Sequence, residues 1–171
     1  VLFGLNQQMA QGTALLMVLP NVLLALLRYH QRNRISLRNA LMLIIPGFCF
    51  AWLTSLWAVR LDAHTMRLGF VAFLIVLTLF NLIQMYWHKG QASSELRHVK
   101  WLWLLGVGSG MTGGLFGVGS GVVATPILTG VFGATQVAAQ GLALALAAPS
   151  TAITLVTYAV HDHVNWQMGI P

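Results

Sequence analysis

Sixty consecutive residues of this chain, 101–160, contain no Asp, Glu, Lys, Arg or His. Soluble domains carry charge on about 25% of their residues, and a soluble fold of this size could not keep so long an uncharged stretch away from water. Across all 171 residues, 57% are hydrophobic and 7% are charged. We therefore expect an all-α, polytopic transmembrane protein, because helices satisfy their own backbone hydrogen bonds in lipid.

The charged residues flank apolar segments. Three segments are free of internal charge and about 20 residues long, which is the length that spans a bilayer: 5–27, 39–59 and 68–87. The loop between the first two contains four arginines and no acid, which indicates the cytoplasmic side. The net charge of +6 is therefore a topology signal, and we expect no nucleic-acid partner. The single cysteine, Cys49, excludes a disulfide framework.

The chain also resembles itself. Residues 1–42 align without a gap on residues 130–171 at an offset of 129, with 11 of 42 pairs identical, and both copies contain a Gln-x-x-Ala-Gln-Gly run followed by a proline. We infer an internal repeat, which in membrane proteins is typical of transporters whose substrate site forms where the two copies meet. The predicted parts are 1–88, a cytoplasmic linker at 89–100, and 101–171. Because each copy lacks segments present in the other, we expect a chain truncated at both ends.

A glycine-rich segment follows the linker. Ten glycines lie between residues 106 and 133, and each costs a helix interior about 1 kcal/mol relative to Ala. One unbroken helix over 101–132 would be about 48 Å long, against a bilayer core of about 30 Å. We expect a broken or re-entrant helix with its break around residues 117–121. Unwound backbone at membrane depth must be buried in protein or line a wet cavity.

Two roles are open for these glycines. Consecutive glycines can turn several N–H groups toward one point, where the helix that follows adds the positive end of its dipole, and such a site suits a small oxyanion. The candidate residues are Gly117, Gly119, Ser120 and Gly121. Alternatively, the small-x-x-x-small spacings Gly110/Gly114, Gly113/Gly117 and Gly117/Gly121 let helices pack closely.

Gln11 and Gln140 occupy equivalent places in the two copies, each near the start of an apolar segment. A buried amide without partners costs about 1–3 kcal/mol, so both must be bonded. Either they make interhelical structural bonds, or they face the substrate path together with Ser150 and Asn21. Pro20 and Pro149 each remove a backbone hydrogen bond and are expected to kink their helices, and Pro126 is a third expected helix-breaking residue.

The residue runs resemble a known family. The relevant runs are Gly117-Val-Gly-Ser-Gly-Val-Val-Ala-Thr-Pro126-Ile-Leu, Gln140-Gly141, Pro149-Ser150 and Val164-Asn165-Trp166. They resemble the sulfite exporter TauE/SafE family of integral membrane permeases over essentially the whole chain. The resemblance implies a multi-pass protein of the inner (cytoplasmic) membrane that moves small inorganic or organic anions, including sulfite and organosulfonates.

Other functions have less support in the sequence. All three acids lie in loops, and no catalytic constellation, phosphate-binding loop or cofactor motif is present, so we expect neither an enzyme nor a cofactor. His161 and His163 are two apart in a loop, where a metal site is not expected. The alternatives to a carrier are an anion channel and a non-transporting assembly protein whose glycines only pack helices. A homo-oligomer is left open.

The orientation of the two copies follows from loop charge. The loop after the first apolar segment has four arginines, whereas its equivalent at 158–167 has none. Positive loops favour the cytoplasmic side, so the two loops are expected on opposite faces of the membrane. This pattern favours an inverted arrangement of the repeats.

Overall fold

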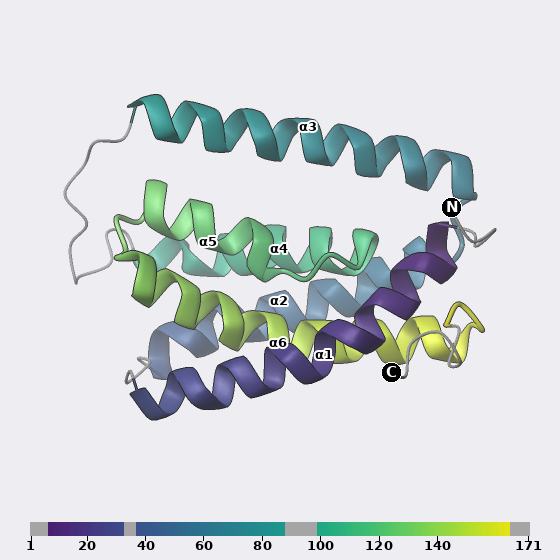
Figure 1. The fold of residues 1–171 in the computed structure, drawn as a ribbon, viewed down its shortest axis with the longest axis horizontal. Helices are drawn as coiled ribbons and strands as arrows, with labels where there is room; N and C mark the ends of the chain where they lie inside the picture. Colours follow the sequence, from purple (N-terminus) through teal and green to yellow (C-terminus); the bar gives the residue numbers. More distant parts are fainter. Residues whose placement is uncertain (1–6, 33–36, 88–98, 165–171) are drawn as a thin grey trace.

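The computed structural model describes residues 7–32, 37–87 and 99–164. Every regular element in these ranges is helical, which confirms the expected all-α class (Figure 1). The α-helices are α1 (Gln7–Arg32), α2 (Leu37–Ala58), α3 (Ala63–Trp87), α4 (Leu102–Phe116), α5 (Gly121–Gly130) and α6 (Gln136–Val160), and a 3-10 turn, η1 (Val99–Trp101), precedes α4.

Four of these helices, α1, α2, α3 and α6, are long and apolar enough to cross a membrane. The three spans expected from the sequence fall on α1, α2 and α3. Within its most apolar window, α6 is 61% buried and α3 only 6% buried. Thus α6 is the central helix, while α3 runs along the outside of the bundle (Figure 1).

Local signals fix several helix ends. The Thr135 side chain accepts a hydrogen bond from the backbone N–H of Ala138 and so caps the start of α6. Asp62 caps α3 in the same way, with its Oδ2 2.8 Å from the backbone nitrogen of Thr65. α4 ends where Gly117 adopts a left-handed conformation, with φ +63° and its N–H bonded to the Gly113 carbonyl.

Small residues bring α2 and α4 together. Gly106, Gly110 and Gly114 recur every four residues on one face of α4, and a Cβ on any of them would lie within 2.5 Å of an α2 atom. A Cβ on Gly110, for example, would lie 2.3 Å from the carbonyl oxygen of Gly47. Close backbone approach of this kind is the role of small-x-x-x-small spacings in membrane helices. These three glycines therefore serve packing.

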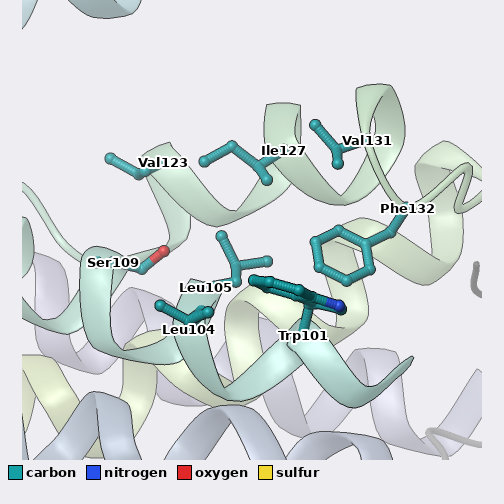
Figure 2. A pocket seen from close by; sticks show the side chains of 9 residues that line it. Trp101, Leu104, Leu105, Ser109, Val123, Ile127, Val131 and Phe132 are labelled. Atoms are coloured by element: carbon teal, nitrogen blue, oxygen red, sulfur yellow. The ribbon is translucent and has the colours of Figure 1, made fainter. Parts of the chain in front are cut away.

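The helices α4 and α5 form a hairpin. Trp101, just before α4, and Phe132, just after α5, line one pocket, whereas Gly113 lies against Ser120 at the other end of the pair. α5 therefore runs back along α4 (Figure 2). With 15 and 10 residues, the two helices are about 22 Å and 15 Å long, so each is shorter than a bilayer core of about 30 Å.

α1 and α6 cross in opposite directions, and each contacts the other near both ends. Tyr158, near the end of α6, donates to Gln11 at the start of α1. Tyr29, near the end of α1, donates to the carbonyl of Val137 at the start of α6. The two tyrosines and the helix starts, Gln7 and Gln136, are each 129 residues apart. The internal repeat itself stays a prediction, and the antiparallel crossing is the arrangement that inverted copies would have.

Two further expectations concern the prolines inside the helices and the linker between the two predicted copies. Pro20, Pro126 and Pro149 lie inside α1, α5 and α6, which continue through them, so these prolines do not end the helices, and the kinks expected at Pro20 and Pro149 stay predictions. A proline removes one backbone hydrogen bond, and packing against neighbouring helices can hold the chain helical across that gap. The linker expected at 89–100 lies almost entirely outside the described residues.

Candidate functional site

The hairpin tip, residues 117–120, is where the helical backbone is interrupted. Gly117 and Gly119 have φ of +63° and +82°, in the left-handed region that favours glycine. Ser120 follows in the right-handed region, with φ −61° and ψ −19°. A left-handed residue followed by a right-handed one turns successive N–H groups into a concavity that suits an anion. The break lies where the glycine pattern predicts it.

Backbone donors are unpaired at this tip. Among the described residues, the N–H groups of Val118, Gly119, Ser120 and Gly121 have no hydrogen-bond acceptor. Hydrogen bonding resumes with the N–H of Val122, which reaches the Gly119 carbonyl at 3.3 Å. The first N–H groups of an α-helix have no partner within the helix and can bind an anion. The four free donors at the start of α5, of which only Ser120 belongs to a fully buried residue, therefore form a candidate anion site.

Two serines join the tip to α6. The hydroxyls of Ser120 and Ser150 are 2.6 Å apart and both side chains are buried. Ser150 also donates to the Leu146 carbonyl at 2.8 Å, and a hydroxyl has one proton. Ser120 must therefore donate to Ser150. This contact uses the Ser120 proton, so at this site Ser120 contributes its backbone N–H and holds the tip against α6.

Two buried polar side-chain atoms near the tip lack a partner, the Nε2 of Gln11 and the Oγ1 of Thr151. A Cβ on Gly117 would lie 3.3 Å from the Gln11 Cβ, and a Cβ on Gly119 would lie 3.8 Å from the Thr151 Oγ1. The Oε1 of Gln11 accepts from the Tyr158 hydroxyl at 3.3 Å. The sequence reasoning missed Thr151, because a threonine beside a serine in an apolar helix carries no distinctive signal.

A cavity of about 350 Å³ adjoins the tip, where α5 faces α1 and α6. Three residues predicted from the sequence line it, Gly119, Gly121 and Gln140. The rest of the lining is mostly apolar: Val18, Val22, Val118, Val122, Thr125, Ala143, Leu144 and Ala147. A cavity beside unpaired backbone donors can hold a small anion.

The other predicted residues do not line this cavity. Gly117, Ser120 and Gln11 are buried at the tip, and Ser150 is held by its bonds within α6 and to Ser120. Asn21 is exposed on α1, and its amide donates to the Met17 carbonyl at 3.0 Å. The structure therefore places Gly119, Gly121 and Gln140 on the cavity, the other predicted residues except Asn21 at the tip beside it, and Asn21 at neither.

A second pocket, of about 500 Å³, lies between α4 and α5 toward the open end of the hairpin (Figure 2). Its walls are almost entirely apolar, with Trp101, Leu105, Ile127 and Phe132 among them. The one hydroxyl in the lining belongs to Ser109, which is fully buried and has no hydrogen-bond partner. No residue predicted from the sequence as a binding residue lines this pocket.

The described residues give no support to a metal centre. They contain no group of three or more His, Cys, Asp or Glu side chains that could hold an ion. The Nδ1 of His161 lies 2.8 Å from the carbonyl oxygen of Thr157 at the end of α6. His163 stacks edge-on against Tyr158.

Comparison with known proteins adds one positive finding. The family model described as "Sulfite exporter TauE/SafE" matches residues 1–171, the whole chain. The chain has no match among curated proteins or solved structures.

Proposed function

This chain belongs to the sulfite exporter TauE/SafE family, and we propose that it is a permease that moves a small anion, sulfite or an organosulfonate, across the cytoplasmic membrane. The observation that carries the proposal is the row of four unpaired N–H groups at residues 118–121, beside a cavity and inside a bundle of apolar helices. As a permease of a transporter family, the protein is not an enzyme.

The tip offers an anion hydrogen bonds in place of water. Hydrogen bonds to charged groups contribute about 1.5–3 kcal/mol each, so four N–H donors supply roughly 6–12 kcal/mol toward dehydration. The start of α5 adds the positive end of a helix dipole, which also favours negative charge. No fixed positive charge lies between residues 101 and 160. The ligand is thus attracted by dipoles, which allow it to leave again.

The contacts that hold the tip support the proposal of alternating access. The hairpin contacts α6 through Ser120 and Ser150, and it contacts α1 through Gly117 and Gln11. α1 and α6 are the helices that correspond in the two predicted copies. In transporters with inverted repeats, one copy rocks against the other around a fixed site. We propose that α4 and α5 are a re-entrant hairpin and that rocking of α1 against α6 exposes its tip to each side in turn.

The glycines have two different structural roles, and this difference helps to decide between a permease and a non-transporting assembly protein. If glycines served only to pack helices, all would lie against another backbone. Gly106, Gly110 and Gly114 do, but a Cβ on Gly119 would have a single neighbour within 4 Å, at 3.8 Å. Gly119 is instead required by its positive φ, which shapes the tip. This favours a binding role over a purely structural assembly protein.

The test is flux of labelled sulfite and of a labelled organosulfonate into liposomes that contain the purified protein. Gly119→Val should abolish flux, because a β-branched residue cannot adopt φ +82° without rearranging the tip. Gly108→Ala, on an exposed face of α4 with nothing within 4 Å, is the matched control and should transport normally. Intact flux in Gly119→Val would contradict the proposed site. Flux that saturates with substrate concentration would favour the carrier over the channel.

A further inference from the structure

We propose that the hydroxyl of Thr151, on α6, is an anion-binding donor that completes the site at the hairpin tip. This inference depends on the proposed function and names a residue of the same site. The N–H groups at residues 118–121 come from the backbone of the hairpin, whereas Thr151 adds a donor from the central helix.

Thr151 is buried and has an unused hydroxyl. Its side chain is 2% exposed and its Oγ1 has no hydrogen-bond partner. A hydroxyl taken from water without a new hydrogen bond destabilises a protein, so a buried, unpaired one in a folded structure calls for an explanation. A ligand that accepts its proton supplies that explanation.

Its neighbours on α6 show that the unused hydroxyl is not a general property of this helix. Thr154 and Thr157 each donate to the carbonyl four residues earlier, at 2.8 and 2.9 Å, which is the usual solution for Ser and Thr in membrane helices. For Thr151 that carbonyl belongs to Ala147, and the Thr151 Oγ1 makes no hydrogen bond to it. The Thr151 proton therefore remains available.

The Thr151 hydroxyl oxygen lies beside Gly119 of the hairpin tip. Apart from Gly119 and its two chain neighbours, Thr151 Oγ1 is the one atom within 4 Å of the position that a Cβ on Gly119 would occupy, at 3.8 Å. The N–H of Gly119 is one of the four unpaired donors, and Gly119 also lines the 350 Å³ cavity. An oxyanion held by these N–H groups has more than one oxygen, so a second oxygen can accept from Thr151. The ligand would then bridge the hairpin and α6.

Transport kinetics of Thr151→Val test the proposal, because valine keeps the shape and removes the donor. A hydrogen bond to a charged group corresponds to about a 10-fold to 100-fold change in affinity. We expect the KM for sulfite to rise by at least roughly tenfold. Thr151→Ser keeps the hydroxyl and should restore a KM near that of the unmodified protein.

Two control variants separate binding from structure. Thr154→Val removes a buried hydroxyl one turn along α6 that is already bonded, and Ser109→Ala removes an unpaired hydroxyl in the other pocket (Figure 2). Both should leave the KM for sulfite unchanged. Thermal unfolding adds a readout that is independent of transport. Without anion, Thr151→Val should unfold at a higher temperature than the unmodified protein, since an unpaired hydroxyl is gone, and added sulfite should stabilise it less.

The possible outcomes distinguish a failure of the proposed permease function from a failure of the role proposed for Thr151. If the unmodified protein neither transports nor is stabilised by sulfite or an organosulfonate, the proposed function is wrong. If it does both, and Thr151→Val has the same KM and the same sulfite-induced stabilisation as Thr154→Val, the function stands and the role given to Thr151 is overturned.

Discussion

Replacing Gly110 with alanine adds a single methyl group to the contact between α2 and α4. Its Cβ would lie 2.3 Å from the carbonyl oxygen of Gly47 and 2.8 Å from the Cα of Gly47. Both neighbours are backbone atoms, which cannot rotate away as a side chain can. Ordinary contacts of this kind begin at about 3.4 Å, so the two helices must move apart by about 1 Å in an interior that is close-packed.

The change in the free energy of unfolding caused by Gly110→Ala is the sum of two opposing effects. Overpacking a tight interior costs about 1–3 kcal/mol, whereas alanine is favoured over glycine in a helix by about 1 kcal/mol. Gly110→Ala should therefore lower the free energy of unfolding by up to about 2 kcal/mol. Gly108→Ala, on the same helix with nothing within 4 Å, has only the favourable term and should raise the free energy by up to about 1 kcal/mol.

The assay is unfolding in mild detergent micelles, with helix content followed by circular dichroism as a denaturing detergent is added. The difference between the two variants isolates the packing cost, because both make the same change of residue in α4. We expect Gly108→Ala to be the more stable by about 1–3 kcal/mol. Equal stability of the two variants would refute the conclusion that this glycine row holds α4 against α2.

Three further perturbations have expected outcomes. Tyr158→Phe removes a buried donor to Gln11 and to the Leu115 carbonyl, so it should lower stability by about 1–3 kcal/mol in the same assay, and by more than Tyr29→Phe does. Gln8→Leu removes the amide that donates to the last carbonyl of α2, of Ala58, at 3.1 Å and to the Leu61 carbonyl in the following turn at 2.6 Å, so hydrogen exchange should quicken in the turn after α2. Hydrogen bonds from Thr65 hold the pKa of the Asp62 carboxyl below its usual value, so the stability that it gives α3 is present above the unfolded-state pKa and is lost as pH falls through the folded-state pKa. Asp62→Ala should remove that part of the acid dependence, measured by thermal unfolding between pH 7 and pH 3.

Patterns along the chain predicted the helices well. The apolar segments at 5–27, 39–59 and 68–87 correspond to α1, α2 and α3, and the glycine-rich segment breaks at the expected place. These features depend on local physics, since a bilayer requires about 20 apolar residues per span and a run of glycines weakens any helix. The prolines do not end α1, α5 or α6, and the kinks expected at Pro20 and Pro149 stay predictions.

The site was predictable only in part. Gly119, Gly121 and Gln140 were identified from glycine spacing and from the repeated Gln-Gly step, and they line the cavity. Spacing could not separate the glycines that pack against α2 from those that form the tip, because that depends on which helix lies opposite. Asn21 was predicted to share the path, yet it lies exposed on α1 and bonds to its own helix.

The sequence by itself determined that this chain is a helical membrane protein with one interrupted segment, because charge-free stretches and glycine content act through the solvent and the local backbone. The tertiary structure alone decided that α5 folds back along α4, that Ser120 donates its proton to Ser150, and that Thr151 keeps its proton free. Each of these depends on which groups meet across helices, and hydrogen bonds between distant residues leave no trace in the spacing of the chain.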